Sequence, residues 1–220
     1  MSTTITRHLE AETLMSYAAG GLAEPLAAVV SAHLALCPAC RAELADMELM
    51  GACLLGARAN QPVHGGVAVP ARPRDTAMAA PSLSAPSLTA GHDRLPGPIA
   101  RRYGLSLETI PWKRLGPGVM HHRLPLSGSA TGDLRLLKIA AGRRMPEHGH
   151  AGGELTLVLD GAYGDETGTY FAGDIQDVGE EIEHTPIADK ELGCICLVAS
   201  ERPAHFKGLF ARLLQPLTGM

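Results

Sequence analysis

The sequence predicts a two-domain α + β protein, in which a small helical N-terminal domain is joined by a Pro-rich linker to an antiparallel β-barrel domain. The first segment, about 58 residues long, is rich in Ala, Leu, Met and Glu, which favours helix. The next carries prolines at positions 62, 70, 73, 81, 86, 96 and 98, so it sustains neither a long helix nor a central strand. Short apolar runs separated by glycines follow. We therefore divide the 220 residues into a helical domain (1–60), a linker (61–97) and a β domain (98–220).

Three helices are expected in the N-terminal domain. The first covers Leu9–Ala19 and stops at the following Gly-Gly pair, because glycine tolerates the left-handed conformation after a helix end. The second begins near Glu24, with a proline in its first turn where a missing N–H costs nothing, and continues through AAVVSAHLAL. A proline opens the third helix in the same way, and this helix covers Pro38 to about Ala57.

The strands of the second domain are expected in the runs ETIPWKRL, LRLLKIAAG, ELTLVLDG, GTYFAGDI and CICLVAS. Short runs joined by glycine-containing connections over about 120 residues are typical of an antiparallel sandwich or barrel. The tail HFKGLFARLLQPL is expected to close the barrel as a short amphipathic segment.

The composition argues against several classes of function. A formal net charge of −4 and a pI near 6.2 give no basic field for nucleic acid, so direct nucleic-acid binding is not expected. No apolar run follows positive charges at the N-terminus and no 18-residue apolar stretch occurs, which argues against a signal peptide and a membrane span. We therefore expect a cytoplasmic protein. In that compartment the five cysteines are expected to be ligands, sensors or buried thiols.

The stretch HLALCPAC places one histidine and two cysteines within eight positions. His33 and Cys37 are four residues apart on the second helix, so they share one face. The CPAC turn lets Cys37 and Cys40 bind one ion, as in other Cys-x-x-Cys zinc sites. Tetrahedral zinc needs a fourth ligand, and His8 is the candidate because antiparallel packing of the first two helices brings it close. The sequence therefore predicts zinc bound by His8, His33, Cys37 and Cys40.

Stability gives this domain a further reason to bind a metal. An alanine-rich unit of this size buries little apolar surface, whereas a structural zinc contributes on the order of 10 kcal/mol of apparent folding free energy. The alternatives are a redox dithiol without metal and buried residues that lie together by chance. A thioredoxin-type motif needs a βαβ context, which this region lacks.

A second ligand cluster is predicted from GRRMPEHGHAGGELTLVLDG, which reads G-x5-H-x-H-x3-E-x6-G. His148 and His150 are two apart on a strand and project to one face, and the AGG loop lets Glu154 return to that face. His184, from a later strand, supplies a fourth ligand. A His3Glu set suits a divalent ion, with zinc preferred and manganese or iron as alternatives. The competing interpretation is that these histidines are exposed loop residues.

Both patterns resemble known families. The order His, then His-x3-Cys-x2-Cys, across short helices resembles the zinc-binding anti-sigma factors. The Gly-bounded His-x-His pattern resembles the first cupin motif in full, whereas the usual Pro-x-Gly is missing before His184. A zinc anti-sigma domain joined to a cupin is the architecture of the ChrR family. Further matches to that family are PWKRLGPGV, ELTLVLDGAYGDET and EHTPIADKELGCICLVA.

The resemblance implies a transcriptional regulator and not an enzyme. It implies an anti-sigma factor that sequesters an extracytoplasmic-function-type sigma factor through its zinc domain and releases it when the metal-binding cupin domain responds to singlet oxygen or organic peroxides. Family members usually add a fourth helix that embraces the sigma factor, and here that region is Pro-rich. The alternative is a cupin metalloenzyme of dioxygenase or isomerase type with an accessory zinc module. No separate general acid or base is identifiable, although Glu147 and Tyr163 are near the ligands in sequence.

Three cysteines lie outside the predicted metal sites. Cys194 and Cys196 face the same way on one strand, and could act as a redox sensor if a thiolate is accessible; otherwise they are small buried apolar residues. Cys53 is expected in the core or on a partner-facing surface. The partner surface is expected on the exposed apolar side of the helices, where Leu44, Met47, Met50 and Leu54 are divided between core and interface. The oligomeric state is not predicted.

Overall fold

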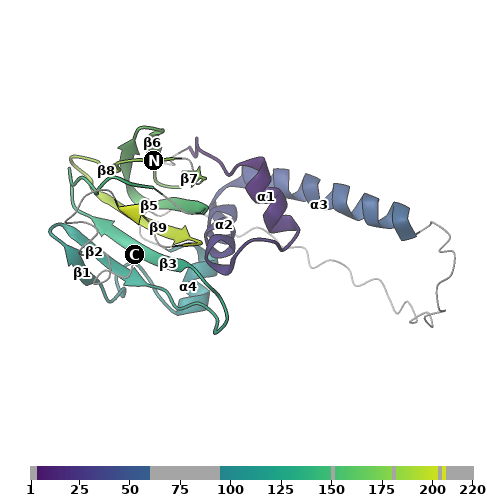
Figure 1. The fold of residues 1–220 in the computed structure, drawn as a ribbon, viewed down its shortest axis with the longest axis horizontal. Helices are drawn as coiled ribbons and strands as arrows, with labels where there is room; N and C mark the ends of the chain where they lie inside the picture. The colour runs from purple at the N-terminus through teal and green to yellow at the C-terminus, as the bar shows by residue number, and fades with distance from the viewer. Residues whose placement is uncertain (1–3, 60–94, 150–151, 180–181, 203–204, 207–220) are drawn as a thin grey trace.

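The computed structural model describes residues 4–59, 95–149, 152–179, 182–202 and 205–206. Most of the Pro-rich segment, His150 and most of the tail lie outside these residues, so the expectations for them stay predictions. The predicted α + β division is confirmed, because helices precede an antiparallel sheet (Figure 1). The helices are α1 (Ala11–Ala18), α2 (Glu24–Leu36), α3 (Pro38–Ala59) and α4 (Gly97–Tyr103).

All strand pairs of the described chain are antiparallel. Within those residues one sheet runs β1-β2-β3-β9-β5-β6, with β7 and β8 also pairing with β5, and β4 pairs with β10. The strands are β1 (Lys113–Gly116), β2 (Val119–Arg123), β3 (Asp133–Ile139), β4 (His148–Gly149), β5 (Glu154–Asp165), β6 (Gly168–Phe171), β7 (Ile175–Val178), β8 (Ile187–Ala188), β9 (Cys194–Ser200) and β10 (His205–Phe206).

The helix boundaries follow the sequence signals closely. Helix α1 begins later than expected because the backbone of Glu10 is extended, with φ −68° and ψ 147°. Helix α2 ends at Leu36, so Cys37 is its C-cap and not a residue within the helix. The sequence analysis missed α4, although a proline in its first turn and a left-handed Gly104 after its end are standard helix signals.

One face of the sheet packs against the helices. Leucines of β3, β5 and β9 share a buried cluster with the apolar face of α2, including Leu26, Val29 and Val30. The opposite face lines the barrel interior, where Val158 and Cys196 belong to a second buried cluster. Because α2 lies on the sheet, the helical region and the β region share a core.

Gly161 shows why the first cupin motif ends in glycine. Its φ is +71°, and a Cβ placed there would lie 2.2 Å from the carbonyl oxygen of Gly193. Strands β5 and β9 can therefore approach at this point only with glycine.

Among the described residues, no single helix is long and apolar enough to span a membrane. Helices α2 and α3 are long and apolar enough only when they are counted together, and the chain bends by 116° between them.

Candidate metal centres

The four residues predicted to bind zinc come together in the structure. His33 lies in the last turn of α2, Cys37 is the C-cap, Cys40 is in the first turn of α3, and His8 is on the extended segment before α1. One ligand atom from each lies within 4.8 Å of all the others. His33, Cys37 and Cys40 are buried and His8 is exposed.

The distances between these atoms suit a tetrahedral zinc ion. The His8 Nδ1 atom lies 3.3 Å from Cys37 Sγ and 3.6 Å from Cys40 Sγ. The His33 Nε2 atom lies 3.4 Å from Cys40 Sγ. Zinc–sulfur bonds near 2.3 Å and zinc–nitrogen bonds near 2.0–2.1 Å at tetrahedral angles give sulfur–nitrogen separations of about 3.6 Å.

The electrostatics of the cluster also fit a metal. Burial, followed by the nearby His8, lowers the pKa of His33 to about 4, while the backbone of Gly173 and the charge of Asp174 act in the opposite direction. His33 is therefore neutral, as a metal ligand must be. Burial raises the pKa of the Cys40 thiol to about 11, so at neutral pH a bound cation is needed to keep this thiol ionised.

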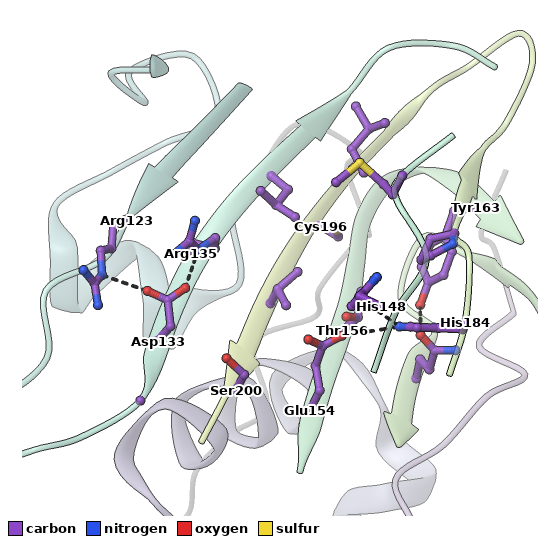
Figure 2. A pocket seen from close by; sticks show the side chains of 17 residues that line it. Arg123, Asp133, Arg135, His148, Glu154, Thr156, Tyr163, His184, Cys196 and Ser200 are labelled. Carbon is purple, nitrogen blue, oxygen red and sulfur yellow. Dashed lines mark hydrogen bonds and ion pairs between the residues drawn. The ribbon is translucent and has the colours of Figure 1, made fainter. Parts of the chain in front are cut away.

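The second cluster brings together three of its four predicted ligands. His148, Glu154 and His184 have ligand atoms within 4.8 Å of one another, and Figure 2 shows their side chains pointing toward each other. The Nε2 atoms of His148 and His184 are 3.1 Å apart, and His184 Nε2 lies 3.9 Å from Glu154 Oε1. His150 lies outside the described residues, so its role as the fourth ligand stays a prediction.

Hydrogen bonds to the other ring nitrogens fix the two histidines. The Nδ1 atom of His148 lies 2.9 Å from the carbonyl oxygen of Pro146, and that of His184 lies 2.7 Å from Asp165 Oδ2. Donation from Nδ1 in each case leaves Nε2 as the lone-pair atom that faces the cluster. This is the usual arrangement around metal-binding histidines.

Asp165 was missed by the sequence analysis. Burial alone would raise the pKa of Asp165, but hydrogen bonds from His184, Thr167 and Gln176 outweigh it and hold this pKa well below its ordinary value. Gln176 Nε2 donates to Asp165 Oδ2 at 2.7 Å and accepts at Oε1 from the Tyr163 hydroxyl at 2.8 Å. The polar Gln176 and Asp177 between two apolar residues of the strand IQDV are the sequence signal that could have indicated this network.

The second cluster opens into a cavity of about 220 Å³. Its walls include apolar side chains of β3 and β9, among them Leu137 and Val198, and Glu154 lies at its edge with the histidines. Figure 2 shows an ion-paired group away from the metal ligands, in which Asp133 lies between Arg123 and Arg135. The site can therefore hold a metal ion that small molecules reach.

Cys194 and Cys196 are free and buried, and Cys196 lines the cavity. The neighbouring Cys194 thiol and burial raise the pKa of Cys196 well above its ordinary value, which disfavours its thiolate. The redox-sensor role of this pair stays a prediction.

Cys53 is exposed on α3. Tyr163 is buried, and Glu147 is exposed.

The structure thus defines a class: a helical domain with a Cys2His2 cluster followed by an antiparallel β domain with a histidine–carboxylate cluster. A zinc-finger family model matches residues 11–41, and the ChrR Cupin-like domain model matches residues 101–203. The anti-sigma-E factor ChrR of Cereibacter sphaeroides is 41% identical over 214 residues, which are 97% of this chain and 98% of that protein.

A solved structure gives the same assignment. The crystal structure of Rhodobacter sphaeroides SigE in complex with the anti-sigma ChrR matches with a TM-score of 0.67 and 38% identity, over 90% of this chain and 99% of that one. This chain belongs to the ChrR family.

Proposed function

We propose that this protein is an anti-sigma factor, which binds an extracytoplasmic-function-type sigma factor through its zinc-containing helices and releases it when the cupin domain receives an oxidative signal. The observation that carries the proposal is the 41% identity to the anti-sigma-E factor ChrR along nearly all of both chains. Since the relative is an anti-sigma factor, a regulatory role is favoured over the alternative of a cupin metalloenzyme.

Helix α3 provides the surface for this partner. Leu44 and Met47 pack against the core, whereas Met50 and Leu54 are 60% and 70% exposed. Leu49 and Leu55 are also exposed, and the distal part of α3 projects away from the sheet (Figure 1). Several exposed leucines and a methionine on one projecting helix favour an apolar partner surface.

The cupin domain is the proposed receiver of the signal. Its ligand cluster lies beside a cavity, so an oxidant such as singlet oxygen or an organic peroxide can reach the bound metal or its histidine ligands. Zinc is the preferred ion in both sites, with manganese or iron as alternatives in the cupin. A partner that acts on RNA polymerase implies a cytoplasmic location.

The test is co-purification of the full chain with candidate sigma factors from the same genome, with metal content determined. The proposal expects a one-to-one complex that contains zinc. A folded, zinc-loaded protein that binds none of them would contradict the anti-sigma assignment, and a substrate screen on the cupin would then test the metalloenzyme alternative.

A further inference from the structure

The zinc ligand His8 differs from its three partners in how it is held. His33, Cys37 and Cys40 lie on or beside helices and are buried, whereas His8 is exposed on a segment without regular secondary structure. Contacts of the neighbouring residues therefore contribute to where His8 lies.

Those contacts come from the cupin domain. The Asp174 carboxylate accepts hydrogen bonds from the backbone N–H groups of Thr6 at 2.7 Å and Arg7 at 3.0 Å. The N–H of Ile175 donates to the Arg7 carbonyl at 3.4 Å. On the other side of His8, the Glu10 N–H donates to the Asp177 carboxylate at 3.1 Å. The backbone is therefore tied to the start and middle of β7 both before and after His8.

Close packing reinforces these hydrogen bonds. A Cβ added at Gly173, where φ is +95°, would lie 2.8 Å from Ile5 Cγ1, so Ile5 sits directly on this turn. The Arg7 guanidinium lies over the ring of Tyr170 on β6, 5.7 Å from its centre. The segment from Tyr170 to Asp177 thus forms the surface against which residues 5–10, including His8, pack.

We propose that Asp174 is a positioning residue of the zinc centre, which holds His8 in place from the cupin domain across the domain boundary. Asp174 is 1% exposed, so its carboxylate is shielded from water and depends on donors such as the Thr6 and Arg7 N–H groups, although these two residues are themselves exposed. As a consequence, the helical domain retains its zinc fully only while β7 is packed against residues 5–10.

Strand β7 is also connected to the cupin cluster through hydrogen bonds. Gln176, between Asp174 and Asp177, donates to Asp165, which in turn accepts from the cupin ligand His184. Strand β7 therefore contacts the surroundings of both clusters, the residues beside His8 on one side and the network behind His184 on the other. This inference rests on the proposed function. It places the regulation of sigma-factor release at the contact between β7 and residues 5–10, which carry His8.

The test uses the full chain with cobalt in the helical site, because thiolate-bound cobalt absorbs strongly and the histidine–carboxylate site gives no such band. Asp174→Asn keeps the shape but weakens acceptance from Thr6 and Arg7, and also from the Phe171 N–H of its own turn, an effect that Thr6→Pro lacks. Removing a partner outside the ligand shell typically weakens a metal site by about 10- to 100-fold, so cobalt loss to a chelator should be faster by this factor. Asp189→Asn is the matched control, because Asp189 accepts from two backbone N–H groups in a turn of its own, at Glu191 and Leu192.

A second variant and a double mutant separate positioning from folding. Thr6→Pro removes the N–H and the hydroxyl that donate to Asp174 without changing the cupin domain, and should also speed cobalt loss. In a His8→Ala background, Asp174→Asn should have a much smaller effect, since the part that acts through His8 is gone and only the influence of the Asp174 charge on His33 remains. Unchanged cobalt loss in both Asp174→Asn and Thr6→Pro, or an equal acceleration without His8, would overturn the proposal. These rates are measured without a sigma factor, so failure of wild-type protein to bind one would count against the proposed function alone.

Discussion

The two metal centres are built in different ways. The zinc cluster joins three buried ligands at the α2–α3 junction with one exposed histidine on an irregular segment. The two described cupin histidines, His148 and His184, lie beside a cavity, and their Nδ1 atoms are engaged by oxygen atoms of Pro146 and Asp165. The first centre holds together segments that have little core of their own, whereas the second is held by a sheet and a hydrogen-bond network.

This difference indicates different roles. A centre that ties a segment to two helices stabilises a fold, so losing its ion removes the binding surface with it. A centre supported by strands β5 and β7 can lose or change its ion while the sheet persists, which suits a receiver of chemical signals. Cys40→Ala and Asp165→Asn test the distinction, and Leu54→Asp and Glu24→Gln test the partner surface and the contact of α2 with Ser127 and Arg102.

The largest effect is expected for Cys40→Ala. It removes a buried ligand, so the helical domain should lose its zinc and on the order of 10 kcal/mol of apparent folding free energy. Zinc content and far-UV circular dichroism measure this, with Cys53→Ala as the control because Cys53 is exposed on the same helix. Full zinc content in Cys40→Ala would show that the thiol is not a ligand.

Asp165→Asn should act on the other centre. Without the carboxylate, His184 loses the acceptor at its Nδ1 atom, and the metal affinity of the cupin should fall by about 10- to 100-fold. Titration of the metal-free protein measures the affinity. Thermal unfolding should leave the sheet folded, in contrast to the helical domain of Cys40→Ala. An unchanged affinity would mean that Asp165 does not orient the ligand.

Leu54→Asp tests the partner surface apart from either metal. Leu54 is 70% exposed, so the free protein should fold and keep its metals, while binding of the sigma factor should weaken about tenfold or more. Leu192→Asp is the control, because Leu192 is 73% exposed on the β domain. Equal binding by wild type and Leu54→Asp would remove this part of α3 from the interface.

The smallest effect is expected for Glu24→Gln. The Glu24 carboxylate accepts from the N–H and hydroxyl of Ser127 and pairs with Arg102, and the Ser127 hydrogen bonds lower its pKa below the ordinary value of 4.5. A lowered pKa of an acid contributes stability above about pH 4.5 that is lost as the pH falls through the lowered pKa. The variant should have a slightly lower Tm at pH 7, and the difference should shrink in acid. A difference that grows in acid would contradict this sign.

The sequence predicted most of the architecture and the grouping of His33, Cys37 and Cys40, because these depend on local signals, and it added His8 from the expected packing of the first two helices. Helix caps, glycine-bounded runs and the CPAC turn are set by neighbouring residues, as is the relation of His33 to Cys37. Asp165, Gln176 and Asp174 were not recognised because their roles depend on strand pairing and packing between residues as distant as Thr6 and Asp174. The packing of α2 on the sheet was likewise not predicted, since an apolar helix face does not identify what covers it.

The decisive experiment is transcription from a sigma-dependent promoter with purified RNA polymerase, the cognate sigma factor and this protein. Wild-type protein should repress transcription, and singlet oxygen, generated by light and a photosensitiser, should relieve the repression. A variant with His148 and Glu154 both replaced by alanine should still repress but should respond less. Absence of repression by the zinc-loaded wild-type protein would contradict the central claim, and an unaltered response in the variant would remove the cupin metal from the signal.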